Sequence, residues 1–189
     1  MMDENKDESP DLSGLALIAL DIQEPFVRAF PRGEEFVSRC TLAVKAAQNL
    51  EIPVIFTEQV PEKLGHTLEN LLAAAGSPTV FAKQRFSCFG AEGLDALLKE
   101  KDIHHLLIAG LETPICVYQS VIDAIDHGYE VTLLSDCVGA RREEDASVVL
   151  RALAGAGAHV LPAETVIYSI LGDTDHRCFR EITSLVKNA

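Results

Sequence analysis

The stretch that decides the fold is HHLLIAGLETPICVYQSVIDAIDHGYEVTLLS, residues 104–135. It opens with a short apolar run at 104–110 and closes with another at 130–135, and a helical pattern over 114–127 separates them. Neither run alternates with polar residues, which is typical of strands buried on both faces of a parallel sheet. Residues 104–135 therefore predict a β-α-β unit with a right-handed crossover.

The same alternation continues along the rest of the chain. Further apolar runs lie at 15–20, 52–56, 79–82 and 159–162, and further helical patterns at 33–51, 91–101, 143–156 and 176–187. Together they predict a three-layer, doubly wound α/β domain whose sheet is mainly parallel and has about six strands. We assign this domain to residues 13–189, and we expect residues 1–12 to form an acidic, flexible leader.

Composition excludes several classes of protein. The 189 residues are 48% hydrophobic and 24% charged, as in ordinary folded domains. A net charge of −13, without clustered Lys and Arg, argues against a nucleic-acid surface. We find no signal peptide and no apolar stretch long enough to span a membrane. The five cysteines are scattered and form no C-x-x-C pair, so we expect a reducing compartment, most simply the cytoplasm.

Ligands of such sheets bind at the carboxyl ends of the strands, so the residues just after each apolar run are the candidates for a site. Asp21 directly follows the run at 15–20, and Lys83 ends the run at 79–82. Each has an ordinary alternative, because an aspartate can cap a turn and a lysine at a strand end is often solvated. Together with a cysteine they form a plausible set for proton transfer.

That cysteine is Cys116. Thr113 is a good helix cap and Pro114 suits the first helical position, so Cys116 is expected in the first turn of the helix. Unpaired amides and the helix dipole there would lower the pKa of the thiol and stabilise an oxyanion. The alternative is that Cys116 is a small buried hydrophobic residue, as most free cysteines are.

Three separated segments resemble the isochorismatase-like cysteine hydrolases, in order and at familiar spacing. The segments are LIALDIQEPF (17–26), FAKQRFSCF (81–89) and GLETPICVYQSVIDAIDHGYEVTLLSDCVGAR (110–141). The resemblance implies hydrolysis of a small amide-type substrate, with Asp21 as general base, Lys83 as its cationic partner and Cys116 as nucleophile. It also implies a cis peptide at Leu111–Glu112, which would aim the amides of Glu112 and Cys116 into the pocket.

One departure from the family pattern concerns metal binding. The metal-dependent nicotinamidases of the family carry an Asp-x-His pair after the second strand, where this chain reads FTEQVPEKLGH (56–66). Because this segment does not reproduce those ligands, we expect no metal and a substrate other than nicotinamide. The expected cysteine chemistry requires no organic cofactor either. The stretches TEQVPEKLG, FSCF and ETVIYSILGDTDHRCFREI (164–182) look closest to the isochorismatase-domain-containing subgroup.

The remaining expectations concern the pocket and its partners. The candidate pocket walls are Gln23, Phe26, Glu58, Gln59, Phe86, Phe89 and Ile115, although a role in the core or in holding a loop is open for each. We expect a small-molecule substrate and a homo-oligomer, a dimer or larger. Two alternatives to amide hydrolysis stay open: vinyl-ether hydrolysis of the isochorismatase type, and a catalytically idle fold that serves as an interaction module.

Overall fold

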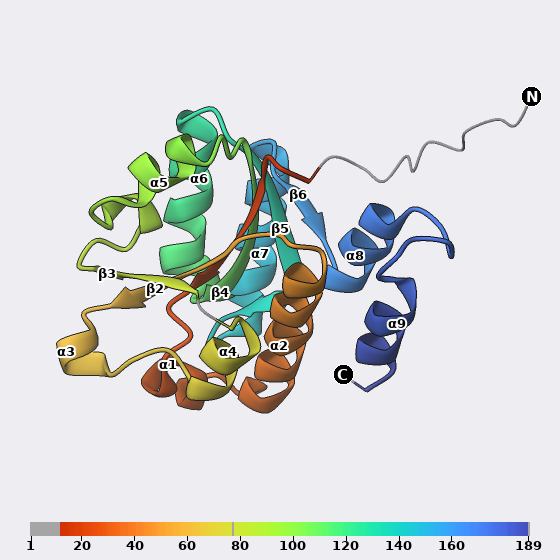
Figure 1. The fold of residues 1–189 in the computed structure, drawn as a ribbon. Helices are drawn as coiled ribbons and strands as arrows, with labels where there is room; N and C mark the ends of the chain where they lie inside the picture. Colours follow the sequence, from red (N-terminus) through yellow and green to blue (C-terminus); the bar gives the residue numbers. More distant parts are fainter. Residues whose placement is uncertain (1–11, 77, 189) are drawn as a thin grey trace, which may run out of the picture.

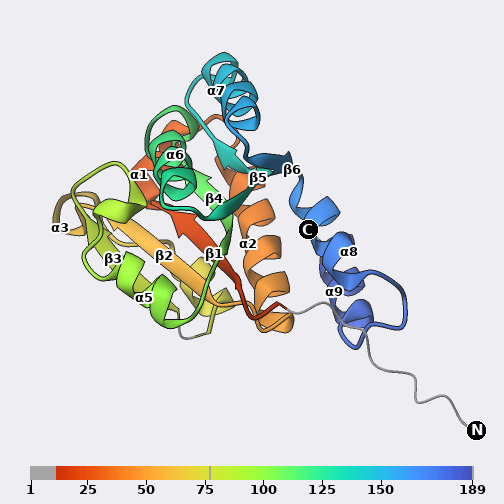
Figure 2. The same ribbon diagram turned by 90° about the horizontal axis from the view of Figure 1, so that it is seen from above.

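The fold is a six-stranded parallel sheet between two layers of helices, in the order β3-β2-β1-β4-β5-β6 (Figures 1 and 2). The computed structural model describes residues 12–76 and 78–188, so the leader expected at 1–12 lies outside the described residues except for Leu12. The predicted three-layer α/β fold is confirmed. The strands are β1 (Leu15–Leu20), β2 (Val54–Gln59), β3 (Thr79–Lys83), β4 (His105–Leu111), β5 (Glu130–Gly139) and β6 (His159–Leu161).

Strand β1 shows why the central strands read as unbroken apolar runs. Leu17 and Ala19 pack into the core cluster on one face of the sheet, and Ile18 packs into the cluster on the other. Because successive side chains of a strand point to opposite faces, a strand covered on both sides has no position left for a polar residue. The first polar residue comes where the strand ends, at Asp21.

Helices cover both faces of the sheet (Figure 2). None of the helices in the described part of the chain is long and apolar enough to cross a bilayer. On one face lie α2 (Gly33–Asn49) and α8 (Ala163–Leu171), with α9 (Phe179–Lys187) packed against α2, and on the other lie α5 (Leu94–Glu100), α6 (Tyr118–Asp126) and α7 (Glu143–Gly155). The short helices are α1 (Glu24–Ala29), α3 (Pro61–Leu64), α4 (Glu69–Ala74), η1 (Cys88–Gly90) and η2 (Thr113–Val117).

The structure adds helices that the apolar pattern did not predict. Helix α8 is the largest of them, with the sequence AETVIYSIL. Its β-branched residues are poor helix formers, so tertiary packing has to stabilise it. Val166, Ile167 and Leu171 supply that packing, because they are buried against the sheet and α2. Strand β5 also runs on to Gly139, beyond the predicted end at 135, through an irregularity in its pairing with β4.

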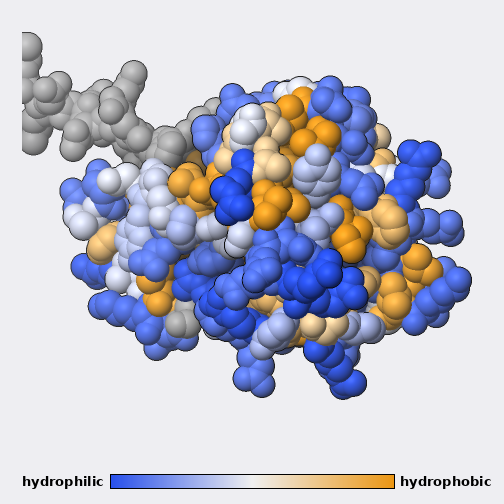
Figure 3. All heavy atoms as spheres, turned by 180° about the vertical axis from the view of Figure 1, so that it is seen from behind, coloured by the Kyte–Doolittle hydropathy of each residue, from blue (hydrophilic) through white to orange (hydrophobic). Residues whose placement is uncertain are grey.

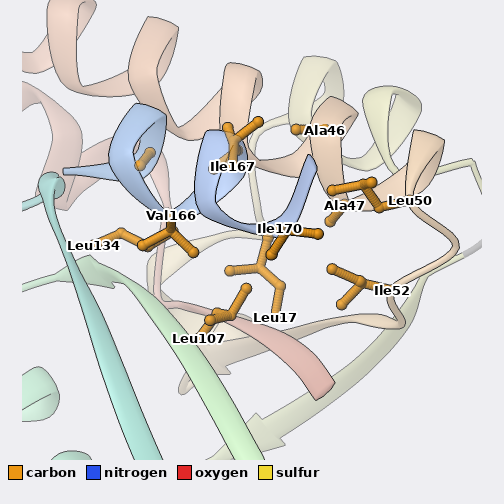
Figure 4. Close-up of a pocket in the computed structure, with 12 residues that line it drawn as sticks. Leu17, Ala46, Ala47, Leu50, Ile52, Leu107, Leu134, Val166, Ile167 and Ile170 are labelled. Atoms are coloured by element: carbon orange, nitrogen blue, oxygen red, sulfur yellow. The ribbon is translucent and has the colours of Figure 1, made fainter. Parts of the chain in front are cut away.

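A small cavity lies in the core where α8 crosses α2 and the sheet (Figure 4). Its volume is about 20 Å³, which is room for roughly one water-sized sphere. Leu17, Leu107 and Leu134 rise from the strands, and Ile167 and Ile170 face them from α8. Because the lining side chains are all apolar, a water there would have no side-chain partners and the void carries no ligand chemistry.

Candidate active site

Asp21 stands at the carboxyl end of β1 with its carboxylate fully buried. The hydroxyl of Thr57 donates to Oδ1 at 2.8 Å, and the ammonium of Lys83 donates to Oδ2 at 2.6 Å. The backbone turns sharply here, because Asp21 has a φ of 53°, a left-handed conformation that aspartate tolerates better than most residues. A buried carboxylate is stable only when it is paired and hydrogen-bonded, and both of its oxygens meet that condition.

Lys83 ends β3 and is held from several sides. Besides Asp21, its Nζ donates to Oε1 of Gln59 at 2.7 Å and to the carbonyl oxygens of Arg85 at 3.2 Å and Phe86 at 3.0 Å. An ammonium has three protons, so these four acceptors occupy it fully. Lys83 therefore fixes Asp21 electrostatically and has no proton to spare for a substrate.

The ends of β1 and β4 approach each other closely at Gly110. A Cβ on Gly110 would lie 2.1 Å from the carbonyl oxygen of Leu20, and the residue has a φ of 130°. Only glycine fits such a contact and such a conformation. One residue further on, the Leu111–Glu112 peptide bond is cis. The chain then enters η2, which carries Cys116 toward the end of β1.

Cys116 lies beside Asp21 and the backbone of Glu112. Both are near enough to its sulfur to act on the pKa of the thiol. Only 6% of the residue is exposed. The structure thus brings Asp21, Lys83 and Cys116 together, with Asp21 between the other two.

The thiol of Cys116 does not have the lowered pKa that its helix position suggested. Burial raises the pKa of Cys116 to about 12, and the negative charge of Asp21 adds to the rise. The charge of Lys83 and the hydrogen bond from the Glu112 amide act against it but do not offset it. The sequence expectation was wrong on this point, because helix position is visible in a sequence and desolvation by the rest of the fold is not.

The turn that holds Cys116 also differs in detail from the expected capped helix. Residues 113–117 form a π-helical turn, in which the amide of Val117 reaches back to the carbonyl of Glu112 at 3.2 Å. Thr113 does not cap it, because its hydroxyl donates to the carbonyl of Gly139 at 3.0 Å. Thr113 therefore ties the cysteine turn to the end of β5, the neighbouring strand.

Gln23 and Gln59 bond to each other and to backbone. Oε1 of Gln23 accepts from the amide of Gln59 at 2.8 Å, and Nε2 of Gln23 donates to the carbonyls of Gln59 and Gly65. Nε2 of Gln59 donates to the carbonyl of Gln84 at 2.8 Å. Both were expected as pocket walls, but their amides are already occupied. Gln59 holds Lys83 in place, and Gln23 holds Gln59.

Glu58 holds a loop. Its carboxylate accepts from the amide of Thr67 at 2.7 Å and lies 2.9 Å from Nδ1 of His66. Burial raises the pKa of Glu58, but the hydrogen bonds from Thr67 and His66 outweigh it and hold the pKa below its ordinary value. Of the two readings left open for Glu58, a substrate contact or a loop anchor, its bonds match the second. Within residues 12–76 and 78–188, no group of three His, Cys, Asp or Glu side chains is placed to hold a metal.

The four apolar candidates for the pocket lie in different surroundings. Ile115 lines a cavity beside the cysteine turn. Phe86 is 51% exposed, and its own backbone carbonyl accepts a hydrogen bond from Lys83. Phe26 packs against the core on the α2 face. The ring of Phe89 stacks on His127, with centroids 4.7 Å apart, at the far end of α6. That is about three helical turns from Cys116, so Phe89 packs in the core away from the thiol.

Thr57 belongs to this site and was not recognised in the sequence. It pairs in register with Leu20, which sets its hydroxyl beside the next residue, Asp21. The available signal was its place in TEQ at the end of a strand, next to residues that were singled out. Its role depends on the register between β1 and β2, which the sequence alone does not fix.

Comparisons with known proteins agree with one another. A model of the isochorismatase domain matches residues 15–165. Isochorismatase family protein 1A of Dictyostelium discoideum is 34% identical over 181 residues, which cover 94% of this chain and 87% of that protein. Isochorismatase domain-containing protein 2 of Bos taurus is 34% identical over 179 residues, or 93% and 85% of the two chains. The MAR1 ribonuclease structure from Caenorhabditis elegans aligns with a TM-score of 0.87 at 30% identity. The alignment covers 94% of this chain and 91% of that chain.

Proposed function

This chain belongs to the isochorismatase-like hydrolase family, and we propose that it is a metal-independent cysteine hydrolase acting on a small substrate with an amide-type C–N bond. The observation that carries the proposal is the place of Asp21 at one buried site, where it accepts a hydrogen bond from Lys83 and acts on the pKa of the Cys116 thiol. A base that touches the nucleophile and is itself oriented by a third group is the arrangement that covalent catalysis needs.

The first step of the proposed reaction is removal of the thiol proton. At neutral pH Cys116 is protonated, since burial and Asp21 raise its pKa to about 12. Asp21 accepts the proton as the sulfur attacks. The negative charge moves from the carboxylate to the sulfur, so the net charge near Lys83 is the same before and after the proton transfer. A buried site favours this internal transfer over a permanent thiolate, whose separate charge would have to be desolvated.

The second step forms and breaks bonds at the substrate carbon. The sulfur adds to the carbonyl, and the amides of Glu112 and Cys116 are our candidates to stabilise the oxyanion. Asp21 passes its proton to the leaving nitrogen, the C–N bond breaks and a thioester with Cys116 remains. Water, deprotonated by Asp21, then hydrolyses the thioester and restores the thiol. This sequence uses no metal and no organic cofactor.

A second candidate is vinyl-ether hydrolysis of the isochorismatase type. One observation favours it: Cys116 is a neutral thiol at rest, so it need not attack. In that reaction Asp21, once protonated, would donate its proton to the substrate and Cys116 would only line the site. The two candidates differ in whether a covalent bond to Cys116 forms.

Partners and location are part of the same proposal. We propose a small-molecule substrate and no nucleic-acid partner, because the net charge of −13 would repel phosphates. The ribonuclease name of the Caenorhabditis elegans protein is therefore not carried over to this chain. We also propose a homo-oligomer in the cytoplasm. On the face shown in Figure 3, apolar residues form small separate groups, so this face offers no large continuous apolar patch for the oligomer contact.

The proposal is tested by turnover of small amides and ureides, followed by ammonia or amine release. We expect activity in the full-length protein, loss of at least about 100-fold in Cys116→Ala and in Asp21→Asn, and full activity after chelation. Cys116→Ser is the matched control, because it keeps a nucleophile of similar size. Amide turnover that survives in Cys116→Ala would refute the covalent step, and turnover lost on chelation would refute metal independence.

A further inference from the structure

Helix α7 buries little of its surface. Among its 13 residues only Leu153 is buried, and Figure 2 shows the helix at an outer corner of the molecule. Its inner side packs against α6 and against η2, the turn that carries Cys116. On its outer side Val148 is 58% exposed, the largest exposed fraction among the large apolar side chains of the described residues. The chemistry proposed above leaves this outer side of α7 unexplained.

The outer side of α7 is formed by Glu144, Val148, Arg151 and Gly155, which we call the α7 stripe. Steps of four, three and four residues set them on one side of a helix, opposite Leu153. All members of the stripe are exposed. No atom lies within 4 Å of the place where a side chain on Gly155 would begin. The stripe is therefore open along the full length of the helix.

The two charged members of the α7 stripe have no ion-pair partner within the described part of the chain. The acid next to Glu144, Asp145, pairs with Arg142 at 2.6 Å. Glu144 and Arg151 form no ion pair with any residue in 12–76 or 78–188. They are seven residues apart, whereas side chains that pair along one helix are three or four apart. The stripe thus presents an acid, an apolar residue and a base in that order.

This order of charges is complementary to itself. When two copies of α7 pack antiparallel, with a two-fold axis between Ser147 and Val148, Glu144 lies level with Arg151 of the partner subunit. A two-fold axis repeats every contact, so two such ion pairs form, one on each side of the paired valines. Each pair lies about 5 Å along the helix from the axis. The pairs therefore stay within reach at the crossing angles that packed helices adopt.

We propose that the α7 stripe is the contact surface of a homodimer of this chain, in which two α7 helices pack antiparallel about a two-fold axis. The inference deepens the homo-oligomer of the proposed function and does not depend on the cysteine chemistry. One helix pair buries less than the roughly 1,600 Å² of a standard interface, so we expect a dissociation constant in the micromolar range. Because α7 also packs against η2, the dimer contact lies beside the turn that carries Cys116.

The contact is tested by sedimentation velocity of the full-length protein over a range of micromolar concentrations. We expect the native protein to shift from one chain of 20.5 kDa toward the mass of two chains as its concentration rises. Glu144→Arg and Arg151→Glu each set like charges opposite one another, so each should raise the dissociation constant at least about tenfold. Val148→Asp removes the apolar centre of the contact and should weaken the dimer to a similar extent.

An equimolar mixture of the Glu144→Arg and Arg151→Glu proteins tests the antiparallel geometry itself. In the mixed dimer both positive positions of one chain face both negative positions of the other, so the mixture should dimerise about as tightly as the native protein. The double variant, which exchanges the two charges within one chain, should also dimerise. Glu69→Arg is the matched control, because Glu69 is an exposed acid in the first turn of another helix, α4. It should change the dissociation constant less than about twofold.

Three results would each overturn the α7 contact: a native protein that stays monomeric, single reversals that leave the assembly unchanged, or a mixture that does not dimerise. In a native assembly larger than a dimer, the same reversals should release a smaller unit. The outcome is separate from that of the cysteine chemistry. A monomer that turns over amides would overturn the α7 contact alone. A dimer of the expected charge dependence without turnover would support the contact and count against the proposed reaction.

Discussion

The ammonium of Lys83 lies 2.6 Å from Oδ2 of Asp21, and neither side chain is exposed to solvent. Such a pair costs desolvation free energy on both sides, and removing one partner leaves an uncompensated buried charge. The pair also sets the charge that faces Cys116. Breaking the pair should therefore change both the free energy of unfolding and the pKa of Cys116.

Lys83→Met should lower the free energy of unfolding by about 3–5 kcal/mol, because the Asp21 carboxylate loses its counter-charge. Asp21→Asn together with Lys83→Met should recover most of that loss, since no charge then remains buried. Urea unfolding of the two single variants and the double variant measures the coupling. Additive losses would show that the two groups do not stabilise each other.

Asp21→Asn should make Cys116 more reactive toward iodoacetamide and at the same time abolish turnover. Asp21 raises the pKa of Cys116 through its charge and its hydrogen bond, so its removal lowers that pKa and increases the thiolate fraction at a given pH. Below its pKa the native thiol should react about tenfold faster per pH unit, up to about pH 12. The alkylation rate against pH gives the pKa of Cys116 in each protein, measured in a Cys178→Ser background because Cys178 is partly exposed. An unchanged midpoint in Asp21→Asn would contradict the contact.

Gln59→Leu should reduce activity through Lys83 and not through substrate binding. Oε1 of Gln59 accepts from the buried ammonium, and such a bond to a charged group contributes about 1.5–3 kcal/mol. We expect kcat to fall with KM little changed, and the pKa of Cys116 to shift. A pure rise in KM would instead mark Gln59 as a substrate contact.

Gly110→Ala should destabilise the fold and the site together. Its Cβ would meet the Leu20 carbonyl at 2.1 Å in a backbone conformation that favours glycine. Overpacking of this kind costs at least about 2 kcal/mol. Gly128→Ala is a useful comparison, because that glycine also has positive φ, at 88°, but nothing lies near its added methyl group. Thermal unfolding of the two variants separates the close contact from the backbone cost that they share.

The sequence was informative where one segment carries its own signal. The apolar run of β1 ends abruptly in Asp21 and that of β3 in Lys83, and parallel strands bring such ends to one edge. It was uninformative about features that depend on contacts between separate segments of the chain. The hydroxyl of Thr57 meets Asp21 only through strand register, and α8 is stable only against the sheet.

The thiol of Cys116 shows the same limit in its chemistry. Position at a helix start predicted a lowered pKa, but the fold encloses the sulfur and sets a carboxylate against it, so the pKa rises to about 12. The side-chain amides of Gln23 and Gln59 show the same limit of the sequence. Gln59 ends β2 and Gln23 follows β1, and both are expected from the sequence to face a substrate, but each is occupied by bonds that only the folded chain brings together.

The most direct test of the central claim is the intact mass of the protein during turnover of an amide substrate, stopped by rapid acid quenching. We predict a fraction of chains heavier by the acyl part of the substrate, with the added mass on the Cys116 peptide and absent in Cys116→Ala. Full turnover with no added mass, in a protein whose Cys116→Ala variant remains active, would contradict it.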